Sequence, residues 1–266
     1  MPPMDFEDLI IERRDHVAVI TFNRPEKLNA FRNSTNLELL RALSEIDADE
    51  AVHAVIITGK GKSFCTGHDL NEPPQAPAVR ISRHSSGRKY LEICEALLHL
   101  RQPIVAAING WCAAGGLGFA LCCDILIASD DAQFYNPQIA YGYPSLPGIG
   151  ALLYRFTSMA NTKDMILARR KVDASTAERM GIVSRVVPKA HLMNEAWDVA
   201  AKIAEVPPDI MAMQREMMNR VWLAVSGTEL SLISGSHTAV AGHSLPDWQE
   251  KEADWKSTTA RDVVAK

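Results

Sequence analysis

Residues 103–123 contain no charged side chain, and this segment limits the possible folds more than any other part of the chain. It is long enough to cross a bilayer as a single helix. However, it also contains residues that would interrupt such a helix: Asn109, Gly110, Gly115, Gly116 and Gly118. The residues before Asn109 favour a strand, and those after Gly115 favour a helix. We therefore expect a buried strand, a loop and a buried helix, with no membrane span.

Strands and helices are predicted to alternate over most of the chain. Short apolar runs predict two strands and a turn over residues 9–23, and further strands over 52–58, 104–108, 125–128 and 132–135. Helical spacing of apolar residues predicts helices over 34–47, 88–100 and 115–123. In the first helix the apolar stripe is expected to comprise Leu37, Leu40, Leu43 and Ile46. The alternation indicates an α/β fold of repeated β-β-α units rather than a sandwich.

The end of the chain has a different pattern, because only helices are predicted from about residue 190. We expect two parts, a core over residues 1–190 and a helical region over 191–266. One predicted helix of the second part carries a cluster of methionines at positions 211, 213, 217 and 218. These side chains either pack in the core or form a subunit contact, for which flexible methionines are well suited.

Charge and cysteine content exclude several classes of protein. The chain has 28 Lys and Arg against 32 Asp and Glu, a net charge of -4, so no nucleic-acid partner is expected. Its five cysteines are an odd number without a CxxC pair, so neither a disulfide framework nor a zinc site is expected. The first residues lack the basic and apolar regions of a secretion signal. A cytoplasmic protein without a metal is therefore expected.

Five segments in order carry a resemblance to a known family: NRPEKLNAF (23–31), FCTGHDL (64–70), PIVAAINGWCAAGGLGFALCCDILIAS (103–129), AQFYNPQIAYGYPSLPGIG (132–150) and AERMGIVSRVVP (177–188). Together they resemble the crotonase superfamily, also called the enoyl-CoA hydratase/isomerase family. The resemblance implies a crotonase-like spiral of β-β-α units. It also implies C-terminal helices that join subunits into a homotrimer or a dimer of trimers. The implied substrate or ligand is an acyl-CoA thioester, with coenzyme A as part of the substrate and no separate cofactor.

The chemistry implied by this resemblance is the stabilisation of an enolate-like oxyanion by two backbone N–H groups. Carried over by position, these groups belong to His68 and Gly115. Gly67 would allow the backbone bend that turns the N–H of His68 inward. Gly115 would begin a helix, where the first N–H groups have no helical acceptor and favour negative charge. In a dry pocket one such donor is typically worth about 10²–10³ in rate.

The same resemblance places the coenzyme A contacts on two segments. The residues concerned are Lys27, Leu28 and Ala30 in the first segment, and Thr66, His68, Asp69 and Leu70 in the second. Most of these contacts are expected from the main chain. The Asp69 carboxylate is expected to hold its loop by accepting backbone N–H bonds, and the His68 side chain to lie at the surface or along pantetheine.

Two positions depart from the family pattern. Family hydratases use two glutamates, one for the attacking water and one for the α-carbon proton. In this chain the corresponding positions are Gly118 and Gln138. Glycine has no side chain, and an amide is not a useful acid or base at neutral pH. Other branches of the family place an aspartate at the position of Leu146. The sequence therefore predicts a member that is not a simple hydratase.

Other side chains could replace the missing glutamates. His84 could act as a base with a pKa near neutrality, or be a solvated loop histidine. Tyr141 could donate a hydrogen bond to the acyl group, or only pack. Isomerisation, C–C or thioester cleavage, and a retro-type lyase step all stay open. The alternative is a non-catalytic acyl-CoA-binding protein, whereas RNA binding would need a basic helix that the sequence lacks.

Overall fold

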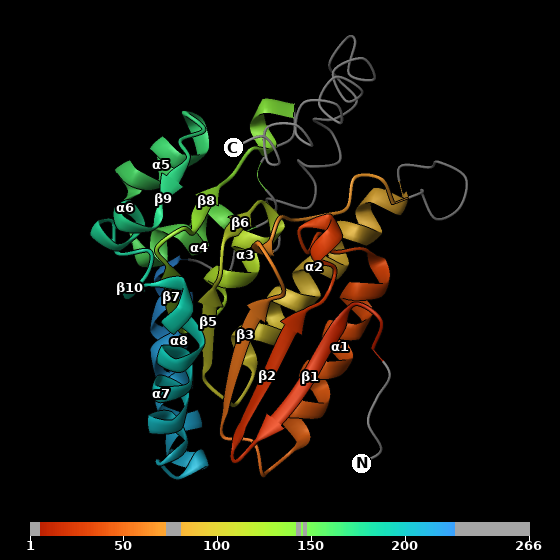
Figure 1. The fold of residues 1–266 in the computed structure, drawn as a ribbon. Helices are drawn as coiled ribbons and strands as arrows, with labels where there is room; N and C mark the ends of the chain where they lie inside the picture. Colours follow the sequence, from red (N-terminus) through yellow and green to blue (C-terminus); the bar gives the residue numbers. More distant parts are fainter. Residues whose placement is uncertain (1–5, 73–80, 142–144, 146–147, 227–266) are drawn as a thin grey trace.

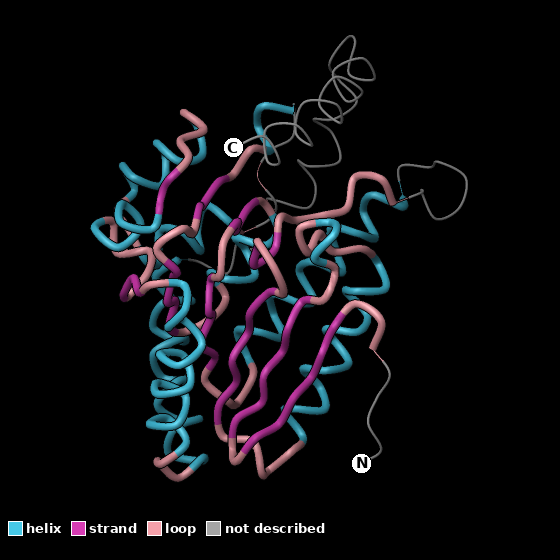
Figure 2. Tube along the Cα trace, viewed as in Figure 1, coloured by secondary structure: helices cyan, strands magenta, loops and turns pink. Residues whose placement is uncertain are grey.

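A computed structural model describes residues 6–72, 81–141, 145 and 148–226 of the chain. At its centre is a six-stranded sheet in the order β1-β2-β3-β5-β7-β10 (Figure 1, Figure 2). In this order the strands span Leu9–Arg14, Val17–Phe22, Ala54–Gly59, Ile104–Ile108, Ile125–Ser129 and Arg185–Val187. β1 and β2 are the two strands predicted over residues 9–23. They pair antiparallel, and each further pair in this sheet is parallel.

A second sheet of four short strands lies beside the ends of the first. It has the order β4-β6-β8-β9, with strands at Ser63–Cys65, Trp111–Ala113, Gln133–Tyr135 and Val172–Asp173. Three times in succession the chain leaves a strand of the large sheet and enters a strand of the small one: β3 to β4, β5 to β6 and β7 to β8. A helix follows each of these pairs, namely α2 (Ile81–His99), α3 (Gly115–Leu121) and, after a short 3-10 helix, α4 (Ile149–Phe156), which confirms the predicted α/β fold of β-β-α units.

The large sheet is covered by helices on both faces. Ile104, Ala106 and Ile108 of β5 pack in one core with helices α1 (Asn33–Ala48) and α2 (Ile81–His99). Val105 and Ala107 of the same strand pack in a second core with helix α7 (Leu192–Ala204). Successive strand residues point to opposite faces, so a strand buried on both faces must be apolar throughout. This arrangement explains the uninterrupted apolar runs in the sequence.

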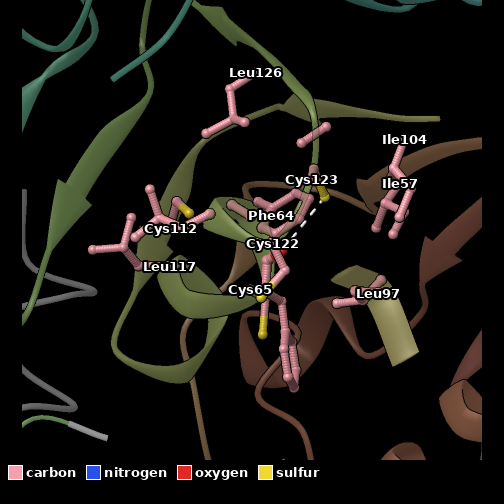
Figure 3. Packing of buried hydrophobic residues seen from close by; sticks show 14 of the residues in the cluster. Ile57, Phe64, Cys65, Leu97, Ile104, Cys112, Leu117, Cys122, Cys123 and Leu126 are labelled. Carbon is pink, nitrogen blue, oxygen red and sulfur yellow. Dashed lines mark hydrogen bonds between the residues drawn. The ribbon is translucent and has the colours of Figure 1, made fainter. Parts of the chain in front are cut away.

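The uncharged segment 103–123 forms the predicted strand, β5, and the predicted helix, α3 (Gly115–Leu121), but the connection that was expected to be a loop contains strand β6. All seven residues of α3 are buried. Side chains from several strands pack around this helix, among them Phe64, Cys65 and Cys112 (Figure 3). All five cysteines are buried and free. Within the described residues, no helix is long and apolar enough to cross a membrane.

Two predicted helices differ in detail from the structure. The buried stripe of α1 runs through Leu39, Leu43 and Ile46, whereas Leu37 is 54% exposed, so its predicted place in the core is wrong. The spacing of Leu37 from this stripe turns its side chain away from the sheet. Helix α2 begins at Ile81, earlier than predicted, and its backbone therefore includes His84, which was expected in a loop.

Seven further helices complete the described part of the chain. They are η1 (Pro25–Lys27), η2 (Gln138–Tyr141), α4 (Ile149–Phe156), α5 (Met159–Leu167), α6 (Ala174–Arg179), η3 (Lys189–His191) and α8 (Pro208–Ser226). The predicted all-helical pattern after residue 190 is confirmed as far as residue 226, and α7 packs directly on the large sheet. Residues 227–266 lie outside the described part, and the division at residue 190 stays a prediction.

Arg215 fixes α8 to the core. Its guanidinium is buried and donates to Asp124 at 2.7 Å, and it also donates to the carbonyls of Leu97, Leu98 and Leu100 at the end of α2. These carbonyls lie at a helix C-terminus, where they have no helical donor and a cation is favoured. Four large apolar side chains on other faces of α8 remain exposed: Ile210, Met213, Met217 and Met218.

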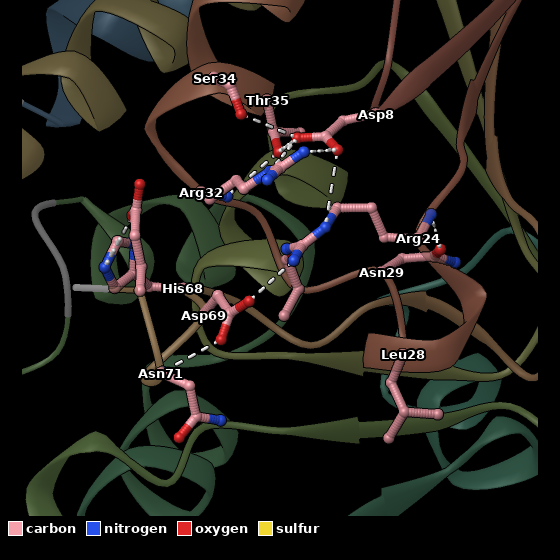
Figure 4. Close-up of polar contacts among 12 residues, drawn as sticks. Asp8, Arg24, Leu28, Asn29, Arg32, Ser34, Thr35, His68, Asp69 and Asn71 are labelled. Carbon is pink, nitrogen blue, oxygen red and sulfur yellow. Dashed lines mark hydrogen bonds and ion pairs between the residues drawn. The ribbon is translucent and has the colours of Figure 1, made fainter.

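Asp8 organises the entry into the fold. Its buried carboxylate accepts hydrogen bonds from Arg32 at 2.8 Å, from Ser34 and from Thr35, and it lies 3.6 Å from Arg24 (Figure 4). Burial would raise the pKa of Asp8, but these hydrogen bonds outweigh it and hold the pKa below its ordinary value. The ionised carboxylate thus joins β1 to the start of α1.

We expect Asp8→Asn to lower the free energy of unfolding by about 3 kcal/mol, because it removes the buried carboxylate that pairs with half-buried Arg32 and lies beside Arg24. The pKa of Asp8 is lowered on folding, so its contribution is present above about pH 4 and lost as the pH falls further. Urea unfolding at pH 7 and pH 3 measures both effects. The wild type should lose more stability on acidification than the variant. Asp15→Asn, the same change at an exposed site, should have little effect.

Candidate functional site

The loop after β4 lies directly against the start of α3. Gly67 in this loop has a φ of 97°, which favours glycine. A Cβ atom added to Gly67 would lie 2.9 Å from the Cβ of Ala114 and 3.1 Å from the backbone nitrogen of Gly115. A side chain therefore has no room between the two segments. The absence of a side chain at Gly67 brings the backbone of the loop next to the N–H of Gly115.

A short backbone pairing with Phe31 sets the direction of the loop. The N–H of Phe31 donates to the carbonyl of Gly67 at 2.8 Å, and the N–H of Asp69 donates to the carbonyl of Phe31 at 2.8 Å. Successive N–H groups of an extended segment point to opposite sides. The N–H of His68, which lies between these two bonds, therefore points away from Phe31.

The start of α3 is held by the small sheet. Ala114 adopts a φ of 48° and a ψ of -123°, which is a strained conformation for a residue with a side chain. Its N–H donates to the carbonyl of Tyr135 at 3.0 Å. A Cβ atom on Gly116 would lie 2.1 Å from the carbonyl oxygen of Cys65, so the helix packs on β4 through bare backbone. These contacts fix the orientation of the first turn of α3.

Two backbone donors are thus left together at the junction of loop and helix. Among the described residues, neither the N–H of His68 nor that of Gly115 donates a hydrogen bond. Gly115 is the first residue of α3, and the first helical N–H groups have no acceptor within the helix. An unpaired N–H in a protein interior strongly favours an acceptor. These are the two residues whose N–H groups were predicted to bind the oxyanion, and that role stays a prediction.

Arg24 joins the two segments that were predicted to contact coenzyme A. Its guanidinium donates to Asp69 at 2.9 Å and also to the carbonyl of Ala30 (Figure 4). The Thr66 hydroxyl donates to the carbonyl of Leu28 at 3.2 Å. The structure thus brings the segment of Lys27, Leu28 and Ala30 beside the segment from Thr66 to Leu70. Binding of coenzyme A there stays a prediction.

The carboxylate of Asp69 supports the loop, as expected. It accepts the N–H of Asn71 at 3.0 Å in addition to the bond from Arg24. Burial would raise the pKa of Asp69, but the hydrogen bonds from Arg24 and Asn71 lower it overall. The group is therefore ionised and fully engaged at neutral pH. Such a carboxylate is poorly suited to proton transfer.

The side chain of His68 lies at the edge of the loop. Its ring contacts Phe31 edge-on at 5.7 Å, and Nε2 lies 3.7 Å from the carboxylate of Glu72. Burial lowers the pKa of His68 and outweighs the opposite influence of Glu72 and Asp69. The imidazole is therefore neutral at pH 7.

The position of the first missing glutamate is occupied by another side chain. A Cβ atom on Gly118 would lie 1.7 Å from the hydroxyl oxygen of Tyr90, and 3.2 Å from a side-chain carbon of Ile149. Tyr90 belongs to α2 and is 1% exposed. Glycine at 118 is therefore required by the tyrosine. A glutamate introduced at this position alone has no space.

The other predicted site residues are placed less completely. Gln138 begins η2, three residues after Tyr135, whose carbonyl accepts from Ala114, so its backbone lies near the start of α3. Tyr141 ends η2 and His84 lies in α2, but their side chains are outside the described part. Leu146 is also outside it. The roles proposed for His84 and Tyr141 stay predictions.

Thiol and metal chemistry find no support among the described groups. Burial raises the pKa of the Cys65 thiol to about 12, and it also raises the pKa values of Cys112 and Cys122 well above the ordinary value. Such thiols are not nucleophilic at neutral pH. Within the described residues, no group of three His, Cys, Asp or Glu side chains is arranged to hold a metal.

Two residues of the site were missed by reasoning from the sequence. Arg24 stands in the segment that carries the resemblance, but its partner Asp69 is distant in sequence. In the sequence, nothing distinguishes Tyr90 from the other apolar residues of its predicted helix. Its relation to Gly118 depends on how α2 and α3 pack, for which the sequence contains no local signal.

Comparisons with known proteins agree with this architecture. The family model described as enoyl-CoA hydratase/isomerase matches residues 12–244. A probable enoyl-CoA hydratase of Mycobacterium bovis is 37% identical over 224 residues, which cover 82% of this chain and 84% of that protein. The 4-chlorobenzoyl coenzyme A dehalogenase-1 of an Arthrobacter species is 30% identical over 254 residues, which cover 94% and 91% of the two chains.

A solved structure gives the same result. An enoyl-CoA hydratase/isomerase from Xanthobacter autotrophicus Py2 is 30% identical and superposes with a TM-score of 0.87, over 98% of this chain and 97% of that one. The fold, the family model and the relatives therefore agree with the five sequence segments. The chain belongs to the enoyl-CoA hydratase/isomerase family of the crotonase superfamily.

Proposed function

We propose that the protein binds an acyl-CoA thioester with its carbonyl oxygen between the N–H groups of His68 and Gly115. The observation that carries this proposal is the pair of unpaired donors, held together by the close approach of Gly67 to the start of α3. Negative charge that develops on the thioester oxygen, as in an enolate, would be stabilised there. Because the donors are fixed by the fold, they need no reorganisation during the reaction.

We further propose that the reaction is not a simple hydration. Hydration requires groups that activate water and exchange a proton. The hydroxyl of Tyr90 fills the space of the first family glutamate, and the second position holds the amide of Gln138. Isomerisation, C–C or thioester cleavage, and a retro-type lyase step need the polarised carbonyl and remain compatible with the site. His84 and Tyr141 stay the candidates for proton transfer.

A second candidate function is non-catalytic binding of acyl-CoA. It is favoured by the same observation that argues against hydration, namely the absence of an acid or base at positions 118 and 138. In either case coenzyme A would be part of the ligand, with no separate cofactor, and we place the protein in the cytoplasm.

Turnover of a panel of thioesters separates the two candidates. Purified protein is incubated with enoyl-, hydroxyacyl- and aryl-CoA esters, and products are followed by mass spectrometry. Conversion of any ester identifies an enzyme, whereas binding without conversion identifies a binding protein. If calorimetry detects no binding of any ester, the proposed function is wrong.

Hydration of crotonyl-CoA by the pure protein should be negligible. Loss of a general acid or base usually costs about 10²–10⁴ in rate. The decrease in enoyl absorbance measures the reaction directly, with an authentic family hydratase as the reference. A turnover number within tenfold of that reference would contradict the prediction.

A triple variant with Gly118→Glu, Gln138→Glu and Tyr90→Leu should gain crotonyl-CoA hydratase activity. The Tyr90→Leu change makes space for the carboxylate at position 118. Two neighbouring carboxylates would also raise one pKa, leaving one acid and one base. We expect hydration at least tenfold above the parent protein, yet far below a natural hydratase, because errors of about 1 Å can cost about 10².

The matched control keeps Tyr90 and carries the two glutamates alone. It should unfold at a lower temperature, because the glutamate at 118 meets the tyrosine hydroxyl. A folded triple variant that binds acyl-CoA but gains no hydration would show that the placement of the site is wrong.

We infer that the subunits assemble as a homotrimer or a dimer of trimers through the C-terminal helices. Exposed fractions of 58–64% for Ile210, Met213, Met217 and Met218 support this, because such an apolar surface is unusual on a monomer. Light scattering at micromolar concentration should return three or six subunit masses. Met217→Glu with Met218→Glu should weaken the assembly, and Leu167→Glu, an equally exposed site on α5, should not. One subunit mass for the wild type would contradict the inference.

A further inference from the structure

The hydroxyl group of Tyr90 is buried between α2 and α3, and the proposed function gives it no role. Its ring packs against Phe119 at 5.2 Å and Phe31 at 6.4 Å between ring centres, so the ring itself is firmly held. The hydroxyl extends beyond this aromatic cluster to the first turn of α3. There it lies where a side chain on Gly118 would begin.

Among the described residues, the hydroxyl of Tyr90 has no partner of good hydrogen-bond geometry, and its one recorded interaction is a weak one with the Cys94 thiol. Its near polar neighbours are the thiols of Cys94, Cys122 and Cys65, which are weak acceptors. A buried hydroxyl without a partner typically destabilises a protein by about 1–3 kcal/mol. A phenylalanine would keep the same aromatic packing without this cost. An acceptor stronger than these thiols would therefore be favoured at this hydroxyl.

The chemical state of this hydroxyl defines what the partner must be. Burial raises the pKa of Tyr90 well above its ordinary value, and the nearby thiols raise it further. The phenol is therefore protonated at neutral pH. A protonated phenol in this position can donate a hydrogen bond, so the missing partner is an acceptor oxygen.

The distance along α3 limits where on a ligand this oxygen can be. Gly118 follows Gly115 by three residues, a rise of about 4.5 Å along the helix. If a thioester oxygen lies at the N–H of Gly115, a group near Gly118 is within reach of the second and third acyl carbons. An oxygen on the third carbon is separated from the thioester oxygen by a similar distance.

We propose that the Tyr90 hydroxyl donates a hydrogen bond to an oxygen on the third carbon of the acyl group, so that the site prefers 3-oxygenated acyl-CoA thioesters. This inference rests on the proposed binding of the thioester at His68 and Gly115. Tyr90 then determines specificity by a contact with the ligand. The side chain of Ile149 lies over the same space, so the bound ligand must displace it.

The test compares two thioesters that differ at the third carbon. Acetoacetyl-CoA carries a carbonyl there, and butyryl-CoA carries a methylene group. Isothermal titration calorimetry should show that the wild type binds acetoacetyl-CoA about tenfold more tightly, the upper range for one hydrogen bond. Tyr90→Phe should remove this preference and leave the affinity for butyryl-CoA within about twofold.

Two controls make the outcome specific. Tyr154→Phe removes the hydroxyl of an exposed tyrosine on α4 and should change neither affinity. The midpoint of thermal unfolding of free Tyr90→Phe should be equal to or above that of the wild type, because an unpaired buried hydroxyl is lost. A structural role alone would move this midpoint without altering the preference between the two thioesters.

The possible failures are distinguishable. Equal binding of both thioesters by the wild type, or a preference retained in Tyr90→Phe, would overturn the inference and leave the proposed function intact. Failure of the wild type to bind either thioester would instead overturn the proposed function.

Discussion

The loop after β4 and the start of α3 approach so closely that a methyl group on Gly67 would come within 3.1 Å of the nitrogen of Gly115. This backbone contact is the constraint on which the site depends. It places two N–H groups from distant parts of the chain side by side without intervening side chains. Two features of the helix also allow this close packing: the strained backbone of Ala114, and the direct backbone contact of Gly116 with β4.

A chain of buried charges supports this contact from the opposite side. Asp8 binds Arg32 and lies near Arg24, and Arg24 in turn binds Asp69 in the loop (Figure 4). The hairpin, the start of α1 and the loop are therefore joined through ionised groups in a mostly buried setting. Removal of one partner of such a pair leaves an uncompensated charge, which is why its effect on stability is large. The same pairs keep Asp69 from taking part in proton transfer.

The sequence predicted the fold well where the information is local. The uncharged run containing Asn109 and four glycines predicted β5 and α3, because residue type and spacing alone decide between strand, turn and helix. It misplaced Leu37, because four apolar residues of α1 allow more than one stripe and the sheet selects one. The donors at His68 and Gly115 came from the resemblance. Tyr90 could not be predicted, since its place beside Gly118 depends on packing between two helices.

The central claim is that the thioester oxygen lies between the N–H groups of His68 and Gly115. Difference infrared spectroscopy of bound butyryl-CoA tests this most directly. The ester is labelled with carbon-13 at the thioester carbon, and the position of its carbonyl stretching band is measured. Two hydrogen bonds from fixed donors in a dry site polarise the carbonyl more than water does. We expect the band of the bound ester to shift to a lower wavenumber than in water. A bound ester whose band stays at or above its position in water would contradict it.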